Sequence, residues 1–481
     1  MSVVLTTPLP ATALSATALS ATALAAPAPS GLDVVGADLP VLLPGGDEVT
    51  FANLDYAATA PCLRVAAEAV AALLPWYGSV HRGAGARSAR CTTAYERART
   101  SIAGFVNARD TDQLIFTRNT TDALNLLARA LPAGTVAVTF DGEHHAALLP
   151  WPQAVRLPAP ATAVGAVTAL GAALRRLRAE RGPEVPVLVA VTGASNVTGE
   201  LWPIAELPAT AHRNGARIAV DAAQLAPHAP VDLTALAVDY LALSGHKLYA
   251  PFGVGVLVGR ADWLDAAAPY LRGGGASARV GTAVGDTDWV SGPARHEGGT
   301  PNLLGAVALA AVCDALTAAD RPALHLAEQR LLRRLRTGLA AVPAAVELGL
   351  FGPEHPRVGI VSVAPPAHDA AVIADRLGPE YGIGVRAGLF CAHPLATRLL
   401  TAAGARPGHQ AAAGARGGVL VRDPEPCSSV PATALRASIG LGSTAADVDR
   451  FVDALAALTA GPLRRPARRR LVCAVVRGGS G

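Results

Sequence analysis

The chain has 481 residues, of which 51% are hydrophobic and only 16% are charged, and its formal net charge is +4. This length is sufficient for two domains with sizeable cores. Alanine inflates the hydrophobic share, and no run of eighteen strongly apolar residues occurs, so the sequence predicts no membrane-spanning helix. Much of the positive charge lies in the tail 464–470, which argues against a nucleic-acid-binding surface.

The six cysteines are dispersed, and no two of them form a CxxC pair. Their spacing therefore suggests neither a disulfide framework nor a zinc site, and we expect no bound metal. A reducing, cytoplasmic environment with at most one or two functional thiols is the simplest expectation. The cysteines are Cys62, Cys91, Cys313, Cys391, Cys427 and Cys473.

Both ends of the chain have low complexity. The pentapeptide SATAL occurs twice near the N-terminus, beginning at Ser15 and Ser20, and no basic region typical of a secretory signal precedes it. We interpret residues 1–31 as a disordered leader, and a mis-assigned start codon explains them equally well. Residues 463–481 are predicted to form a disordered basic tail.

The ordered chain is expected to begin near Leu32. Residues 49–61 read as a strand and a loop, a helix follows over 63–74, and residues 78–83 form a basic loop flanked by glycines. A short strand is then predicted over 113–117.

Two threonines follow that strand and open an amphipathic helix. Thr120 and Thr121 offer hydroxyls beside the free amides of a helix N-terminus, which is a natural cradle for a phosphate. An ordinary N-cap would explain the same residues. We favour the phosphate interpretation because the pair follows a strand and lies well upstream of the lysine described below.

Two further strands are predicted to end in polar residues. Residues 136–140 lead to Glu143-His144-His145, and residues 187–192 lead to a glycine-containing turn with Asn196. No carboxylate or cysteine at ligand spacing supports a metal at the histidines, and the family resemblance described below implies that His144 stacks on a flat ring. The alternation of strands and helices predicts a mostly parallel sheet covered by helices.

The stretch 218–257 organises the rest of the chain. An apolar run ends in Asp221, Gln224 and a helix-like segment follow, and a second run over 240–243 delivers Ser244, His246 and Lys247. Open α/β sheets bind ligands at the carboxyl ends of their strands. A lysine in an apolar pocket loses its proton more easily and can act as an amine nucleophile. Pyridoxal 5′-phosphate needs such a lysine for its Schiff base, an acid for its pyridinium nitrogen and donors for its phosphate.

This block, with SGHK at its end, resembles the cofactor-lysine region of the class V aminotransferase family, in particular its cysteine desulfurase and selenocysteine lyase group. The resemblance covers about residues 45–460 and implies the fold type I architecture of α/β pyridoxal-phosphate transferases. It also implies a homodimer with composite sites, in which Thr300 contacts the phosphate bound to the other subunit. The other residues implied to contact the cofactor are Thr120, Thr121, His144, Asn196, Asp221, Gln224, Ser244, His246 and Lys247.

Residues of the C-terminal third complete the resemblance. Cys391 lies in an R-x-G-x-x-C-A frame that begins at Arg386, and it resembles the persulfide-forming cysteine of the desulfurases. Arg436 matches the arginine that binds the substrate α-carboxylate, a task suited to a bidentate guanidinium. Arg386 is a second candidate for this carboxylate. The padded interval 401–432 departs from the family and is predicted to be a flexible insertion.

The domain organisation follows from the same comparison. Residues 32–62 are expected to join a small domain formed mainly by residues 306–462, and residues 63–305 are expected to form the large domain that binds the cofactor.

The predicted reaction converts L-cysteine to L-alanine and leaves a persulfide on Cys391, with a possible sulfur-acceptor protein as partner. The insertion and the pair Leu389-Phe390 beside the cysteine could reshape the pocket. Three alternatives therefore stay open within the family, namely an aminotransferase, an epimerase or a C–S lyase acting on another amino acid. The alternative in which the protein is not an enzyme is a catalytically silent scaffold or a sulfur-relay partner. The sequence does not name the acceptor or the pathway.

Overall fold

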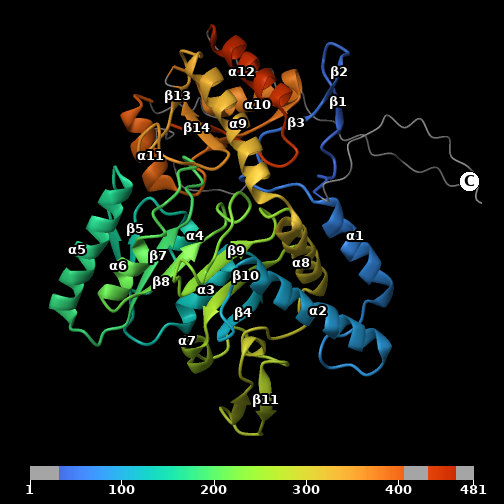
Figure 1. Ribbon diagram of the computed structural model, residues 1–481, viewed down its shortest axis with the longest axis vertical. Helices are drawn as coiled ribbons and strands as arrows, with labels where there is room; N and C mark the ends of the chain where they lie inside the picture. The colour runs from blue at the N-terminus through green and yellow to red at the C-terminus, as the bar shows by residue number, and fades with distance from the viewer. Residues whose placement is uncertain (1–31, 366, 406–431, 462–481) are drawn as a thin grey trace, which may run out of the picture. The chain divides into compact units, whose positions relative to one another are not determined.

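The computed structural model describes residues 32–365, 367–405 and 432–461 (Figure 1). The predicted leader, the basic tail and most of the predicted insertion lie outside these residues. Helix α11 (His393–Ala402) extends two residues into the range predicted for the insertion. All described residues belong to one compact unit, so the boundary predicted near residue 305 stays a prediction.

The largest sheet has seven strands in the order β4-β10-β9-β8-β7-β5-β6. Only β10 runs antiparallel to its two neighbours, so the prediction of an α/β fold with a mostly parallel sheet is confirmed. The strands are β4 (Asp112–Thr117), β5 (Val136–Phe140), β6 (Ala154–Leu157), β7 (Val187–Thr192), β8 (Arg217–Asp221), β9 (Tyr240–Ser244) and β10 (Gly255–Arg260).

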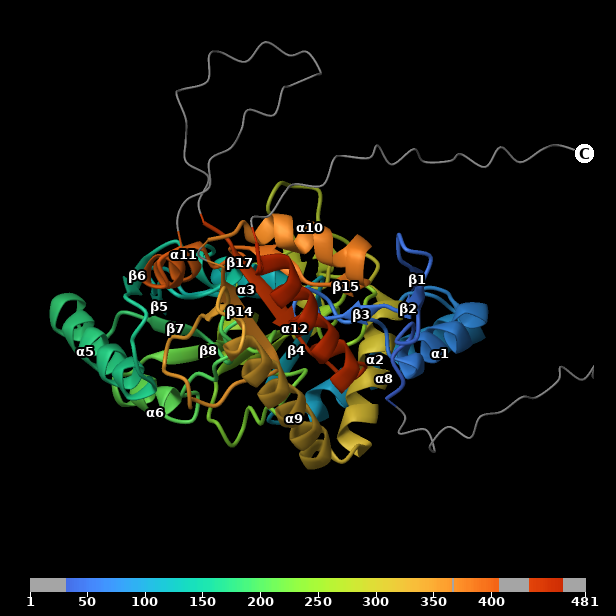
Figure 2. The ribbon, with the colours of Figure 1, turned by 90° about the horizontal axis from the view of Figure 1, so that it is seen from above.

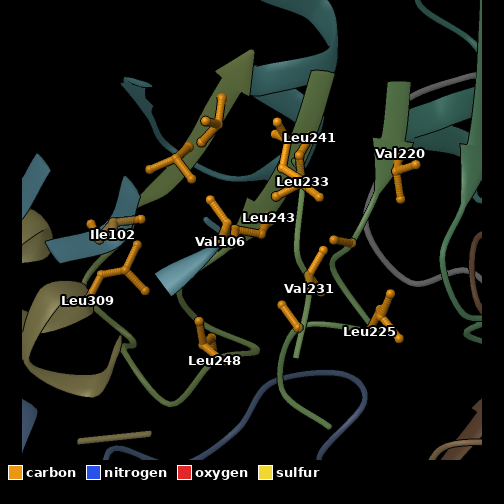
Figure 3. Close-up of a cluster of buried hydrophobic side chains, with 14 of the residues drawn as sticks. Ile102, Val106, Val220, Leu225, Val231, Leu233, Leu241, Leu243, Leu248 and Leu309 are labelled. Carbon is orange, nitrogen blue, oxygen red and sulfur yellow. The ribbon is translucent and has the colours of Figure 1, made fainter. Parts of the chain in front are cut away.

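Both faces of this sheet are buried, and the residues of each strand alternate between the two faces. In β8, Ile218 and Val220 belong to one apolar cluster, whereas Ala219 belongs to the other. Figure 3 shows the first cluster, in which Leu309 of α8 lies beside Ile102 of α2, and Val220 and Leu241 extend from the sheet. The helices that contribute to this cluster are α1 (Arg64–Leu73), α2 (Ala86–Phe105), α5 (Ala163–Arg181), α6 (Leu207–Arg213) and α8 (Leu303–Ala318). The helices that cover the opposite face are α3 (Thr120–Ala130), α4 (His145–Leu148) and α7 (Ala261–Ala266).

A second, antiparallel sheet of four strands has the order β13-β14-β17-β16. It shares an apolar cluster with α9 (Arg321–Ala340), α10 (Ala370–Tyr381) and α12 (Ala445–Thr459). Its strands are β13 (Val346–Glu347), β14 (Ile360–Ala364), β16 (Arg386–Gly388) and β17 (Ala434–Ser438).

The N-terminal segment packs against the C-terminal third of the chain. Strand β3 (Ala52–Asn53) pairs in parallel with β15 (Ile383–Gly384), and Figure 2 shows the two side by side. Leu54 is fully buried in the same cluster as the four-stranded sheet. The smaller elements are the hairpins β1 (Pro40–Leu42) with β2 (Glu48–Thr50) and β11 (Ser277–Val280) with β12 (Thr287–Trp289), and the 3-10 turns η1 (Leu74–Trp76) and η2 (Pro293–Arg295).

One element predicted from the sequence is wrong. The segment between Gln224 and β9 was expected to be helix-like, but the structure has only turns there. Pro227 and Pro230 interrupt this segment, and proline lacks the amide that a helix interior requires. The connection from β8 to β9 therefore crosses the sheet without a helix.

Within the described residues, no single helix is long and apolar enough to cross a membrane. Helices α8 and α9 meet the length and composition test only as a pair joined across a bend of 93°.

Gly255 of β10 allows the turn before α3 to approach the sheet. A Cβ atom at this position would lie 2.6 Å from Asn119 Cα and 2.8 Å from Leu243 O, and neither backbone atom can move freely. We expect Gly255→Ala to lower the free energy of unfolding by about 1–3 kcal/mol, as overpacking does. Chemical denaturation measures this change.

Gly104 provides the matched control, because it lies in α2 and a Cβ atom there meets nothing within 4 Å. Gly104→Ala should stabilise the protein by roughly 0.5–1 kcal/mol, since alanine favours a helix over glycine. Equal stability of the two variants would contradict the close approach at Gly255.

Candidate active site

A cavity of about 210 Å³ lies where the parallel strands end. It brings together all the site residues predicted from the sequence except Gln224 and Thr300. Polar side chains from strand ends far apart in the sequence converge there because the carboxyl ends of parallel strands share one edge. The predicted residues that line the cavity are Thr120, Thr121, His144, Asn196, Asp221, Ser244, His246, Lys247, Arg386, Cys391 and Arg436.

One end of the cavity lies at the N-terminus of α3. Ser244 Oγ accepts a hydrogen bond from Thr120 N at 2.8 Å and pairs with Thr120 Oγ1 at 2.8 Å. Asn119 caps the helix by accepting from Asp122 N, so the first turn is well formed. Hydroxyls of Thr120, Thr121 and Ser244 thus gather where the helix dipole favours an anion.

Lys247 follows β9 directly and faces Asp221 at the end of β8. Burial lowers the pKa of the Lys247 amine below its usual range, while the charge of Asp221 opposes this shift. Burial raises the pKa of Asp221, against the attraction of Lys247. Asp221 Oδ1 accepts from Ala223 N at 2.9 Å, which orients the carboxyl group and leaves Oδ2 for a ligand in the cavity.

Lys247 is the only lysine among the 481 residues, and arginine accounts for all other residues in the Lys+Arg count. A count of lysines is a signal that sequence reasoning missed. It means that an aldehyde cofactor can bond to only one side-chain amine in this protein.

His144 lies on the cavity wall as a neutral imidazole. Burial lowers the pKa of His144 to about 3, and the nearby charge of Lys247 adds to this effect. Its Nδ1 accepts from Ala146 N at 3.0 Å, so the proton of the neutral ring is on Nε2. A neutral ring with a fixed tautomer suits the predicted stacking role.

Glu143 is a buried acid to which the sequence assigned no role. Its side chain is fully buried, and neither carboxyl oxygen has a hydrogen-bond partner among the described residues. Burial raises the pKa of Glu143 well above its usual range, and the charge of Asp221 raises it further. Both effects favour the protonated, neutral form of Glu143 beside the carboxyl group that faces the cavity.

Two arginines lie opposite each other on neighbouring strands. Arg386 of β16 is the direct cross-strand partner of Arg436 of β17, and both line the cavity. Like charges placed opposite each other destabilise a sheet unless an anion lies between them. Burial lowers the pKa of Arg436 to about 10, and its Nη2 contacts Asp55 Oδ1 at 3.2 Å. Arg436 Nε is buried without a partner among the described residues, and each terminal nitrogen carries two hydrogens, so the guanidinium retains donors for a carboxylate.

Cys391 is the only exposed cysteine among the four in the described residues, and it lines the same cavity. It lies between β16 and α11 on a short turn. The sequence frame that begins at Arg386 thus places a thiol close to the arginine pair and to Lys247.

Gln224 and Thr300 lie outside the cavity wall. Gln224 is buried, and its amide donates to Ala57 O at 2.8 Å. Ala57 lines the cavity, so Gln224 supports the wall from behind. Thr300 lines a different cavity of about 360 Å³ with Tyr270 and Arg118. The predicted contacts of Gln224 with the cofactor and of Thr300 with a partner's phosphate stay predictions.

The donor set fits pyridoxal 5′-phosphate. The hydroxyls at the start of α3 suit its phosphate, the Asp221 carboxyl suits its ring nitrogen, and Lys247 suits its aldehyde. His144 and the amide of Asn196 complete the polar wall. No cluster of three or more metal-ligating side chains occurs in the described part of the chain.

Comparisons with known proteins support this interpretation. Residues 52–451 match the sequence profile of the class V aminotransferases. A cysteine desulfurase of Dickeya dadantii is 37% identical over 377 residues, which covers 76% of this chain and 89% of the relative. A cysteine desulfurase of Escherichia coli strain SE11 is 35% identical over 371 residues, with coverages of 76% and 90%.

Solved structures show the same similarity. The cysteine desulfurase CsdA of Escherichia coli superposes with a TM-score of 0.67 at 30% identity, covering 84% of this chain and 94% of that one. The desulfurase of Thermococcus onnurineus superposes with a TM-score of 0.71 at 27% identity, with coverages of 86% and 95%. The fold and the site thus define a pyridoxal-phosphate-dependent enzyme of fold type I. The chain belongs to the class V aminotransferase family.

The neutral state of Glu143 predicts how stability depends on pH. When folding raises the pKa of an acid, the folded state loses stability as the pH rises above the pKa of that acid in the unfolded chain. For glutamate this pKa is 4.5. Glu143→Gln removes this titration. The variant should therefore gain stability relative to the wild type by up to about 1.4 kcal/mol for each pH unit above that value.

Urea denaturation of both proteins from pH 4 to pH 8 measures the difference. Glu206→Gln is the matched control, because Glu206 is an exposed residue at the start of α6. Parallel stability curves for wild type and Glu143→Gln would contradict a neutral Glu143.

Proposed function

We propose that this protein is a cysteine desulfurase that converts L-cysteine to L-alanine and receives the sulfur as a persulfide on Cys391. The observation that carries the proposal is the convergence of Lys247, Arg436 and an exposed Cys391 on one cavity. The similarity to curated cysteine desulfurases over 76% of the chain supports it.

Arg436 and Arg386 orient the substrate by binding its α-carboxylate. The guanidinium of Arg436 retains unused donors, and the cross-strand position of Arg386 adds a second positive charge to the same wall. When bound, pyridoxal 5′-phosphate supplies an aldehyde for the substrate amine and a ring that accepts the electrons released at Cα. Asp221 stabilises the positive charge on the ring nitrogen.

Lys247 moves the α-proton. Its amine would be free to act once the substrate amine is bound to the cofactor, and burial, which lowers its pKa, favours the neutral form that accepts a proton. His144 covers the ring as a neutral imidazole and excludes water from that face. The hydroxyls of Thr120, Thr121 and Ser244 hold the phosphate in place during these steps.

Cys391 removes the substrate sulfur. Its thiolate attacks the sulfur of cysteine, an S–S bond forms and the Cβ–S bond breaks, with the electron pair passing to the carbon side. Protonation of that carbon gives alanine, and Cys391 keeps the sulfur as a persulfide. L-cysteine and one thiol thus become L-alanine and one persulfide, without an external oxidant or reductant.

Three further properties belong to the same proposal. A homodimer with Thr300 directed at the partner's phosphate agrees with the position of Thr300 outside this chain's own cavity. A sulfur-acceptor protein would receive the persulfide from the exposed Cys391. A cytoplasmic location fits the four described cysteines, which are all free thiols.

The first experiment incubates the cofactor-loaded protein with L-cysteine and a reducing thiol and measures alanine and sulfide. We expect equal amounts of both from the wild type and at least a hundredfold loss in Cys391→Ser, since the persulfide-forming thiol is gone. Cys62→Ser is the matched control and should keep full activity, because that half-buried thiol donates to Leu63 O away from the cavity.

Other outcomes identify the alternatives. Sulfide with pyruvate instead of alanine indicates a C–S lyase, whereas racemisation or transamination of other amino acids indicates an epimerase or an aminotransferase. Borohydride reduction of the loaded protein should attach one cofactor to each chain, at Lys247. A protein that binds no cofactor by this test would support a silent scaffold or relay partner.

Mixed dimers test the composite site. Lys247→Ala and Thr300→Ala homodimers should both be weakly active, because each lacks one group in both sites. Exchange of subunits should restore roughly a quarter of wild-type activity, since half of the dimers then carry one complete site. No gain after exchange would contradict a phosphate contact from the partner subunit.

A further inference from the structure

Three buried residues from distant parts of the chain contact one another beside the cavity. Asn196 Nδ2 donates to Phe390 O at 2.6 Å, and Arg436 Nη1 donates to Asn196 O at 3.0 Å. The guanidinium carbon of Arg436 lies 4.8 Å from the centre of the Phe390 ring, so each of the three residues contacts the other two. Exposed fractions of 8% for Asn196, 6% for Phe390 and 2% for Arg436 show that little water reaches these contacts.

The backbone at this place is strained. Phe390 and Cys391 have φ values of 52° and 55°, in the left-handed region that non-glycine residues rarely adopt. Such a conformation persists only where its surroundings hold it. Two hydrogen bonds do so here, from Asn196 Nδ2 to Phe390 O and from His145 N to Cys391 O at 2.7 Å.

The Phe390 ring provides a third anchor. It packs into a small apolar cluster with Val197 and Leu395, and its other contact is the guanidinium of Arg436. A cation over an aromatic face is attracted more strongly when both groups are removed from water. The ring therefore joins the backbone of Cys391 to the arginine that binds the carboxylate.

We propose that Phe390 is a positioning residue that couples binding of the substrate carboxylate at Arg436 to the placement of the Cys391 thiol. This inference rests on the proposed function. It gives a role to a residue that the sequence showed only as a neighbour of Cys391 able to reshape the pocket.

The coupling follows from the contacts of Arg436. Its Nη2 and Nη1 atoms hydrogen-bond Asp55 and Asn196, and each of them keeps a second N–H, so the guanidinium retains donors for a carboxylate. A bound carboxylate shares the charge that the Phe390 ring contacts and draws the guanidinium toward itself. Because Phe390 precedes Cys391 directly, the shift reaches the nucleophile. Coupling between two sites acts in both directions, so a change in the placement of Cys391 must also change the affinity of Arg436 for a carboxylate.

Phe390→Leu tests the proposal, because leucine fills the apolar cluster but cannot contact the cation as an aromatic face does. In single-turnover mixing with L-cysteine, we expect alanine formation to slow by roughly tenfold, whereas KM changes by less than about threefold because Arg436 keeps its other partners. Phe390→Tyr, which retains the ring, should keep most of the wild-type rate. Phe451→Leu, which removes an equally buried ring in α12, is the control and should keep the wild-type rate.

A second measurement needs no turnover. Iodoacetamide alkylation of Cys391 in the loaded protein is followed by peptide mass spectrometry with and without L-alanine, which carries the same carboxylate. We expect L-alanine to change the alkylation rate several-fold in the wild type and in Phe390→Tyr, and to leave it unchanged in Phe390→Leu.

The outcomes separate this inference from the proposed function. A wild type that makes no alanine but shows the L-alanine effect on alkylation refutes the desulfurase and keeps the coupling. Equal alanine formation by the wild type and Phe390→Leu, or the same L-alanine effect in both, overturns the role of Phe390. An equal loss of rate in Phe451→Leu also overturns it, because any lost ring would then act alike.

Discussion

The removal of one amine from water is the physical constraint on which this site depends. Lys247 is the single lysine of the chain, and the fold buries it at the end of β9 opposite the carboxyl of Asp221. Burial favours the neutral amine, which is the nucleophilic form, while Asp221 prevents a complete loss of charge. The parallel strands make this arrangement possible, because each ends at the same edge of the sheet and contributes its last polar side chain there.

The same burial determines the state of the surrounding acids and bases. His144 stays neutral and Glu143 stays protonated, each because the charged form would lose its hydration. Of the two neighbouring acids, Asp221 is therefore the one whose carboxyl group has an oxygen left for a ligand. Glu143 lies beside it and adds no charge when protonated. The site thus separates two neighbouring carboxyl groups into different roles by environment alone.

Sequence reasoning predicted the strands that end in polar residues and most of the residues that line the cavity, because apolar runs with fixed polar ends have a local signature. It failed where long-range contacts decide. The segment after Gln224 was expected to be helix-like, but two prolines leave it as turns. The hydrogen bond from the Gln224 amide to Ala57 in the cavity wall is likewise a long-range contact without a local signature. Nothing local in the sequence shows that Glu143 lacks partners or that Asp55 holds Arg436.

Phe390 illustrates the same limit at the nucleophile. From the sequence it was only an unusual neighbour of Cys391, since a left-handed φ and a contact with Arg436 are properties of the folded chain. The measurement that tests the central claim most directly is peptide mass spectrometry of the loaded protein after addition of L-cysteine without any acceptor. The account predicts one additional sulfur atom on Cys391, none on Cys62, and one alanine released for each sulfur retained. Alanine released without sulfur on Cys391, or sulfur retained on a different cysteine, would contradict it.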